Sequence, residues 1–183
     1  RCADVGVDPE GTLVQFNTLP PPLDILEEVK KRGYRVILEV AVSDKSNSGG
    51  GYAVWKGPQV EDVNSGSAAN LIGQVVYRRE FIDYAMFDAS HGTNLGLDLN
   101  SDSLAINFGR FFNLDFEIAM ADIGLVYAGG VGPDNVRYVT KTLDSFFPNG
   151  FSIDTESKVR IDDKLKLDLV RDYLVGYGDA MES

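Results

Sequence analysis

The chain has 183 residues, of which 44% are hydrophobic and 25% are charged, and this balance is typical of a single globular domain, here residues 1–183. Its formal net charge is -11 and its sequence pI is about 4.4, so nucleic acid and anionic membranes are excluded as expected partners. One cysteine cannot form an internal disulfide and no apolar run is long enough to span a membrane, so we expect a cytoplasmic protein.

The first part of the chain predicts an alternation of strands and helices. A short strand is expected over 13–16, followed by a helix over 23–32 with Gly33 at its carboxyl end, and then by an apolar strand over 34–42. Residues 43–67 are rich in Gly, Ser and Asn, and they are too many for an ordinary loop. We therefore predict an insertion or a lid at 43–67.

The middle of the chain repeats the pattern. Residues 71–81 favour a helix, and residues 82–87 form an apolar strand that ends at Asp88. Ser101 or Asp102 is the expected cap of the next helix, whose apolar face is formed by Leu104, Phe108 and Phe111.

A fourth strand and helix are expected on either side of a glycine turn. The strand covers 125–128, and Pro133 suits the first position of a helix that ends before Pro148. The predicted buried face of this helix consists of Val136, Val139, Leu143 and Phe146.

Residues 151–183 end the alternation. Residues 151–153 form a strand, and the final helix is expected over 165–175, with a frayed tail after Gly176 and an apolar stripe of Leu165, Leu169 and Tyr173. Strands that alternate with helices indicate an α/β fold with a parallel sheet. Periodicity alone leaves open whether the sheet is an open, doubly wound one or part of a barrel.

Glycines follow the strand at 125–128 and precede the next helix. Gly129, Gly130 and Gly132 let backbone N–H groups approach an anion, which indicates phosphate binding. The other interpretation is a tight turn with positive φ, which the glycines alone favour. The chain has no P-loop, dinucleotide fingerprint, metal-ligand cluster or nucleophile elbow, so we expect no cofactor and no metal.

Five segments together resemble the motifs of one enzyme family. Residues 14–17 (VQFN) resemble V-Q-L-H after a fourth barrel strand, residues 86–88 (MFD) resemble L-L-D at the end of a sixth, and residues 91–98 (HGTNLGLD) resemble G-G-[ST]-G-K-T-F-D. Residues 128–136 (AGGVGPDNV) resemble S-G-G-L-x-P-E-N-V, and residues 153–160 (IDTESKVR) resemble V-D-V-S-S-G-V-E. These motifs belong to phosphoribosylanthranilate isomerase, a (β/α)8 TIM barrel of tryptophan biosynthesis. The resemblance implies an incomplete barrel with strands four to eight.

The resemblance also implies a reaction, the Amadori isomerisation of an N-aryl phosphoribosylamine. An acid protonates the furanose ring oxygen, and a base removes the C2 proton. Asp88 is implied as the acid, which must be kept protonated by burial or by a carboxylate such as Asp98. Without the resemblance, a cap or bridge of its own loop is the favoured interpretation of Asp88; with the resemblance, the two interpretations are equal. The implied partner is a phosphorylated sugar, bound by Gly129, Gly130, Asp154, Thr155 and Ser157.

The sequence departs from the family at several positions, among them Asn94 and Leu95 in the loop after strand six. Asn17 replaces a His, and the family's catalytic Cys on strand one has no counterpart, because Cys2 lacks a strand to hold it. Lys158 stands where the family has a Gly that contacts phosphate; its ammonium attracts phosphate, whereas its Cβ crowds the backbone approach. Three functions therefore stay open: the isomerase, another phosphosugar enzyme on the same barrel, and a non-catalytic phosphate-binding or interaction protein.

Overall fold

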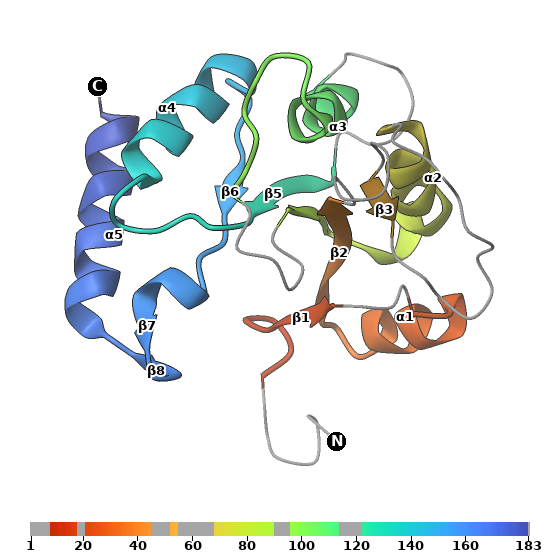
Figure 1. Ribbon diagram of the computed structural model, residues 1–183. Helices are drawn as coiled ribbons and strands as arrows, with labels where there is room; N and C mark the ends of the chain where they lie inside the picture. The colour runs from red at the N-terminus through yellow and green to blue at the C-terminus, as the bar shows by residue number, and fades with distance from the viewer. Residues whose placement is uncertain are drawn as a thin grey trace.

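The computed structural model describes residues 8–17, 21–44, 52–54, 68–89, 96–113 and 122–182. Its main sheet contains a run of parallel strands whose spatial order is their order in the chain: β1 (Leu13–Phe16), β2 (Arg35–Asp44), β4 (Tyr84–Asp88), β5 (Gly124–Ala128) and β6 (Ser152–Ile153). Among the described strands, β1 and β6 each pair with one neighbour only, so the sheet is an open arc (Figure 1). The predicted parallel α/β arc is confirmed.

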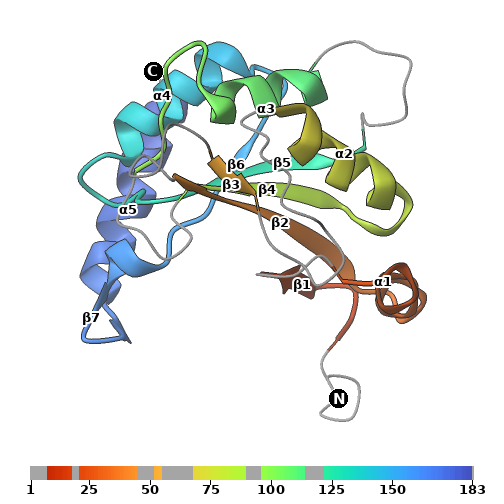
Figure 2. The same ribbon diagram turned by 45° about the vertical axis from the view of Figure 1, so that its right-hand side comes forward.

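Helices follow the strands along the outer side of this arc. They are α1 (Leu23–Lys31), α2 (Ala68–Arg78), α3 (Leu104–Asn113), α4 (Val136–Phe146) and α5 (Leu167–Met181), with short 3-10 turns η3 (Arg79–Phe81) and η4 (Ser157–Val159). Figure 2 shows α2, α3 and α4 on the same side of β2, β4 and β5. None of the described helices is long and apolar enough to cross a membrane.

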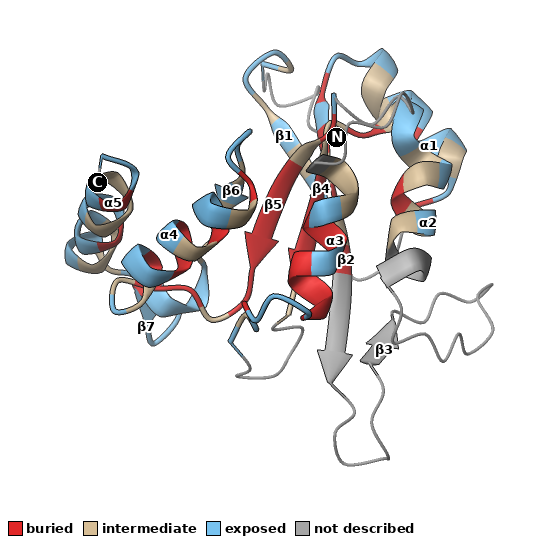
Figure 3. Cartoon of the chain, turned by 90° about the horizontal axis from the view of Figure 1, so that it is seen from above, coloured by how far each residue is buried: buried red, intermediate tan, exposed pale blue. Residues whose placement is uncertain are grey.

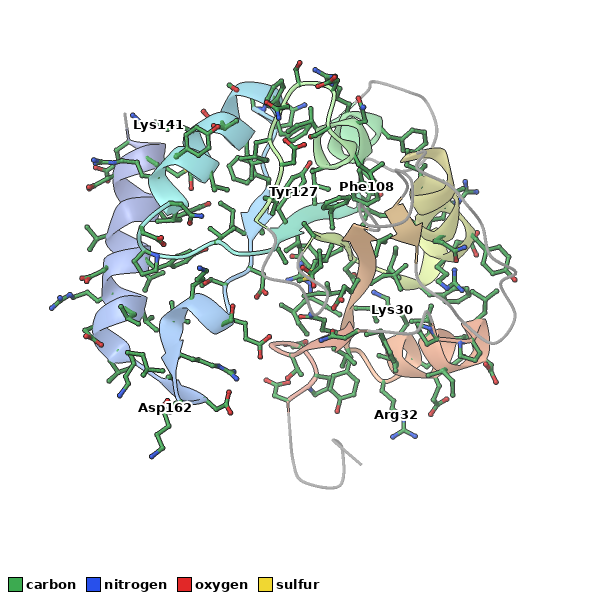
Figure 4. All side chains as sticks on the ribbon, in the orientation of Figure 1. Lys30, Arg32, Phe108, Tyr127, Lys141 and Asp162 are labelled. Carbon is green, nitrogen blue, oxygen red and sulfur yellow. The ribbon has the colours of Figure 1, made fainter. Side chains whose placement is uncertain are left out.

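The main core lies between the outer face of the sheet and these helices. The side chains of Phe108 in α3 and Tyr127 in β5 are 0% exposed, and they lie near the centre of the molecule (Figure 4). The Phe87 ring contacts Phe108 at a centroid distance of 5.6 Å, and the Phe147 ring stacks on Tyr127 at 5.7 Å. Burial is concentrated on β4, β5 and the inner side of α3, as Figure 3 shows. Aromatic contacts therefore join two successive βα units, β4–α3 and β5–α4.

A second, smaller apolar cluster covers the inner face of the sheet. Met86, Val126 and Ala128 are buried there, and Ile37 and Tyr84 pack against them. Because side chains alternate between the two faces of a strand, β4 and β5 contribute to both clusters. Their apolar runs are those of strands that are buried on both sides.

Asp83 anchors the amino end of the sheet. One carboxylate oxygen accepts a hydrogen bond from the Val36 backbone N–H at 2.7 Å, and the Lys30 ammonium binds the same carboxylate at 2.7 Å. This ion pair lies just before β4, whereas Asp88 lies at the opposite, carboxyl end of that strand.

The segment 43–67 contains a strand that the sequence did not predict. β3 (Tyr52–Val54) pairs antiparallel with the extension of β2, through Val42, Ser43 and Asp44. This extension passes the last residue of β2 that pairs with β4, so β3 lies at the carboxyl edge of the sheet. Most of 43–67 lies outside the described residues, so the lid stays a prediction.

Two helix starts differ from expectation. Pro133 is not the first helical residue, because α4 begins at Val136 and Asn135 is its N-cap. The cap of α3 is neither Ser101 nor Asp102; the Ile106 N–H donates to Ser103 Oγ at 3.3 Å. The Ser103 side chain caps α3, whereas the Asn135 side chain makes no hydrogen bond to the first turn of α4.

The buried aromatic residue at the end of α4 is Phe147, not Phe146. Phe147 is 0% exposed, whereas Phe146 is only partly buried. Phe147 has φ -132° and ψ 64°, so the chain leaves the helix there and the helical period no longer predicts the buried side. Leu143 is buried as expected.

The last elements differ most from the prediction. Leu165 is not on the last helix but in β8 (Lys164–Leu165), which pairs antiparallel with β7 (Arg160–Ile161). Helix α5 continues to Met181, and the expected fraying after Gly176 is wrong. A Cβ on Gly176 would lie 2.8 Å from Val136 Cγ1, so this glycine allows α4 and α5 to pack closely (Figure 1).

Candidate functional site

Three of the predicted site positions meet at the carboxyl edge of the sheet. Asp88 pairs with Ala128, the residue before Gly129, and the Ala89 N–H donates to the Ala128 carbonyl at 3.2 Å. Asp154 follows β6, and its N–H donates to the Tyr127 carbonyl at 2.8 Å. The ends of β4, β5 and β6 therefore place Asp88, Gly129 and Asp154 on one rim, as the resemblance implied.

Asp88 and Asp154 lie on the inner side of the arc. Asp88 lies two residues after Met86, which is part of the inner cluster, so both are on the same face. Asp154 likewise lies two residues after Ser152, which pairs with the inner-facing Val126. One strand separates the two aspartates, so their Cα atoms are about 10 Å apart, two strand spacings. The residue between them is Ala128, a small, buried member of the inner cluster.

The raised carboxyl pKa at this rim belongs to Asp154. Burial raises the pKa of Asp154 above its ordinary value, and the negative charges of Glu156 and Asp88 raise it further. The Tyr173 hydroxyl donates a hydrogen bond to the carbonyl of Ile153, the residue before Asp154, at 3.2 Å. Burial raises the pKa of Tyr173 to about 12, and the charges of Asp154 and Tyr177 contribute to this shift. The sequence had not placed Tyr173 at the site.

Asp98 forms hydrogen bonds within its own loop, and its predicted role beside Asp88 stays a prediction. Its carboxylate accepts hydrogen bonds from the Asn100 backbone N–H at 3.0 Å and from Asn100 Nδ2 at 2.7 Å. Asp98 thus holds its own loop, and Asp154 and Asp88 are the carboxylates that interact.

Replacing Asp154 with asparagine is expected to stabilise the protein at neutral pH. The folded state raises the pKa of Asp154, so folding favours its protonated form, and the ionised form costs stability above that pKa. The gain should shrink as the pH falls and vanish below the ordinary carboxyl pKa of 3.8. Urea unfolding of Asp154→Asn and wild type at several pH values measures this.

The matched control is Asp144→Asn, because Asp144 is exposed on α4. It should leave the free energy of unfolding at pH 7 close to that of wild type. An Asp154→Asn protein that is less stable than wild type at pH 7 would contradict the account of the rim.

The loop after β5 is a tight turn held by Asn135. Gly129 has φ 124° and Gly130 has φ 62°, which confirms the predicted turn with positive φ. Asn135 Oδ1 accepts from the Gly132 N–H at 2.8 Å, and Asn135 Nδ2 donates to the Gly130 carbonyl at 3.1 Å. The sequence did not single out Asn135, although it lies in the segment that resembles the family most closely.

The loop after β6 contacts the glycine loop directly. The Thr155 hydroxyl donates to the Val131 carbonyl at 2.7 Å, and the Lys158 side chain lies against Gly132. Glu156 forms an ion pair with Arg160 at 3.3 Å, and Ser157 is exposed at the start of η4. The predicted binding residues Gly129, Gly130, Thr155 and Ser157 therefore come from two loops that touch. No group of three or more metal-binding side chains occurs in the described ranges.

Solved structures with the same fold are known. No protein-family model and no curated protein matches the sequence. A phosphoribosylanthranilate isomerase in complex with reduced 1-(o-carboxyphenylamino)-1-deoxyribulose 5-phosphate superposes with a TM-score of 0.50 and 15% identity, over 91% of this chain and 58% of that one. The Thermotoga maritima isomerase gives a TM-score of 0.52 and 16% identity, over 91% of this chain and 60% of its own. The chain has the fold of these isomerases.

The likeness covers part of that barrel only. The chain spans 58% to 60% of the length of the two isomerases, and its open parallel arc is that of an incomplete barrel. The predicted resemblance is thus confirmed at the level of fold. Identities of 15% to 16% carry no assignment of residues, and the roles of Asp88 and of the two loops stay predictions.

Proposed function

We propose that this chain is a phosphoribosylanthranilate isomerase-like protein whose rim binds a phosphorylated N-aryl sugar. One observation carries the proposal: three separate segments that resemble the family's motifs end at neighbouring positions of one rim. Asp88, the Gly129-Gly130 turn and Asp154 follow three adjacent strands. Active sites of such barrels are formed at this edge, and phosphate is commonly held by the loops after the last two strands.

The proposed roles follow from position. The resemblance implies Asp88 as the acid that donates a proton to the furanose ring oxygen, and Asp88 lies on the inner side of the rim, where the sugar would bind. The loops at Gly129-Gly130 and Thr155–Ser157 bind the phosphate, and Asp154 hydrogen-bonds the sugar. The described residues include no cysteine that could act as the base, so they supply the acid and the binding groups of the reaction.

The ligand of the solved isomerase is the sharpest probe of this function. We expect the chain to bind reduced 1-(o-carboxyphenylamino)-1-deoxyribulose 5-phosphate saturably in a calorimetric titration, and ribose 5-phosphate more weakly, because the latter lacks the aryl group. Gly130→Asp should weaken the binding of both ligands by at least about tenfold, since a carboxylate beside the phosphate repels it.

A folded control and two contrary outcomes make the titration decisive. Gly73→Ala, a substitution at an exposed helix position without neighbours, should bind as wild type does. Equal affinity for the arylamino and plain sugar phosphates would favour the other phosphosugar proteins of this fold. The absence of saturable binding to either ligand at millimolar concentration would contradict phosphosugar binding altogether.

A further inference from the structure

Lys158 lies between the two loops of the rim. A Cβ built on Gly132 would lie 2.6 Å from Lys158 Cβ and 3.1 Å from Lys158 Cγ. The aliphatic stem of Lys158 therefore covers the backbone of the loop after β5, and packing fixes the first atoms of a side chain that is otherwise flexible. The isomerase family has a glycine at this position. In this chain a lysine stands there, and its stem packs against the neighbouring loop.

The hydrogen-bonding groups of the two loops are partly engaged within the chain. The Gly132 N–H donates to Asn135, and the Thr155 hydroxyl donates to the Val131 carbonyl. Neither proton is available to a ligand in this arrangement. A phosphate at the rim therefore needs another source of attraction than these two donors.

The charges around the loops favour Lys158 as that source. Asp134 Oδ1 lies 3.1 Å from the same Cβ position on Gly132, and Asp154 and Glu156 add acidic groups next to it. Arg160 is paired with Glu156, whereas none of the described residues forms an ion pair with Lys158. Without the ammonium of Lys158, a phosphate dianion would meet a largely acidic rim.

We propose that Lys158 binds the phosphate of the sugar through its ammonium, in place of the backbone contact that a glycine permits. This rests on the proposed function, because it deepens the same site. Lys158 is then a specificity residue: it selects a phosphorylated sugar over the unphosphorylated one, and Asp134 opposes it.

Titration with ribose 5-phosphate tests the proposal. Lys158→Met keeps an unbranched stem against Gly132 and removes the charge, so it should weaken ribose 5-phosphate binding about tenfold or more. Asp134→Asn should strengthen binding. Raising the salt concentration should weaken binding to wild type, and it should have less effect on Lys158→Met. Unfolding midpoints of both variants confirm that they are folded.

Lys141→Met is the matched control, because Lys141 is an exposed lysine on α4, away from the two loops (Figure 4). It should bind ribose 5-phosphate as wild type does. If wild type binds and Lys158→Met binds equally well, the role of Lys158 is overturned while the proposed function stands. If wild type itself binds no sugar phosphate, the proposed function fails, and the role of Lys158 fails with it.

Discussion

Replacing Phe147 with alanine is expected to lower the free energy of unfolding by about 3–5 kcal/mol, the usual range for a buried aromatic residue. The Phe147 ring is 0% exposed and stacks on Tyr127 at a centroid distance of 5.7 Å. Its removal leaves a cavity between α4, β5 and α3 that these elements cannot fill by small movements. Urea unfolding of the variant measures the loss.

Phe146→Ala is the matched control, since the two residues are adjacent and of the same type. Phe146 is partly exposed, and the Arg110 guanidinium lies 5.4 Å from its ring centroid at the surface. Phe146→Ala should lower the free energy of unfolding clearly less than Phe147→Ala does. A larger loss for Phe146→Ala would show that the end of α4 is turned the other way.

Gly109→Ala is expected to destabilise the protein by about 2 kcal/mol or more, because it overpacks the same core. A Cβ on Gly109 would clash with the Tyr127 hydroxyl and would lie 2.5 Å from Phe147 Cζ. Tyr127 cannot move away easily, because it is 0% exposed and its hydroxyl donates to the Ala105 carbonyl at 3.1 Å. Thermal or urea unfolding measures the effect.

The same substitution at Gly73 should have the opposite sign. Gly73 lies inside α2, and among the described residues no atom beyond its own helix backbone lies within 4 Å of its Cβ position, so alanine there only gains helix propensity, up to about 1 kcal/mol. Equal changes at both glycines would show that α3 does not pack on Tyr127 as described.

The sequence predicted the strands and helices of the arc because their signals are local. Apolar runs end at Asp88 and Gly129, and Gly33, with φ 84°, ends α1 as a C-cap glycine should. The β7–β8 hairpin escaped prediction because its strands have two residues each and its turn uses Asp162 and Asp163 with φ 52° and 58°. Positive φ at two aspartates carries none of the usual glycine signal.

The end of α5 shows a second kind of limit. The sequence predicts fraying after Gly176, but tertiary packing extends the helix to Met181. Gly176 contacts Val136 across the α4–α5 interface, and Ala180 is buried. Such contacts between distant segments have no local sequence pattern.

The site was predictable in position but not in detail. Strand ends that carry Asp88, Gly129 and Asp154 meet at one edge of any parallel sheet of this order. Two details depend on distances between loops. Burial raises the pKa of Asp154, and Asn135 holds the glycine loop. No spacing in the sequence encodes these distances.

Amide NMR shifts during titration with ribose 5-phosphate test the central claim most directly. The account predicts saturable shifts at Gly129, Gly130 and residues 155–158, and none at Asp83 and Val36 at the amino end of the sheet. Shifts at the amino end, or no saturable shift at millimolar ligand in the folded protein, would contradict a phosphosugar site at the carboxyl rim.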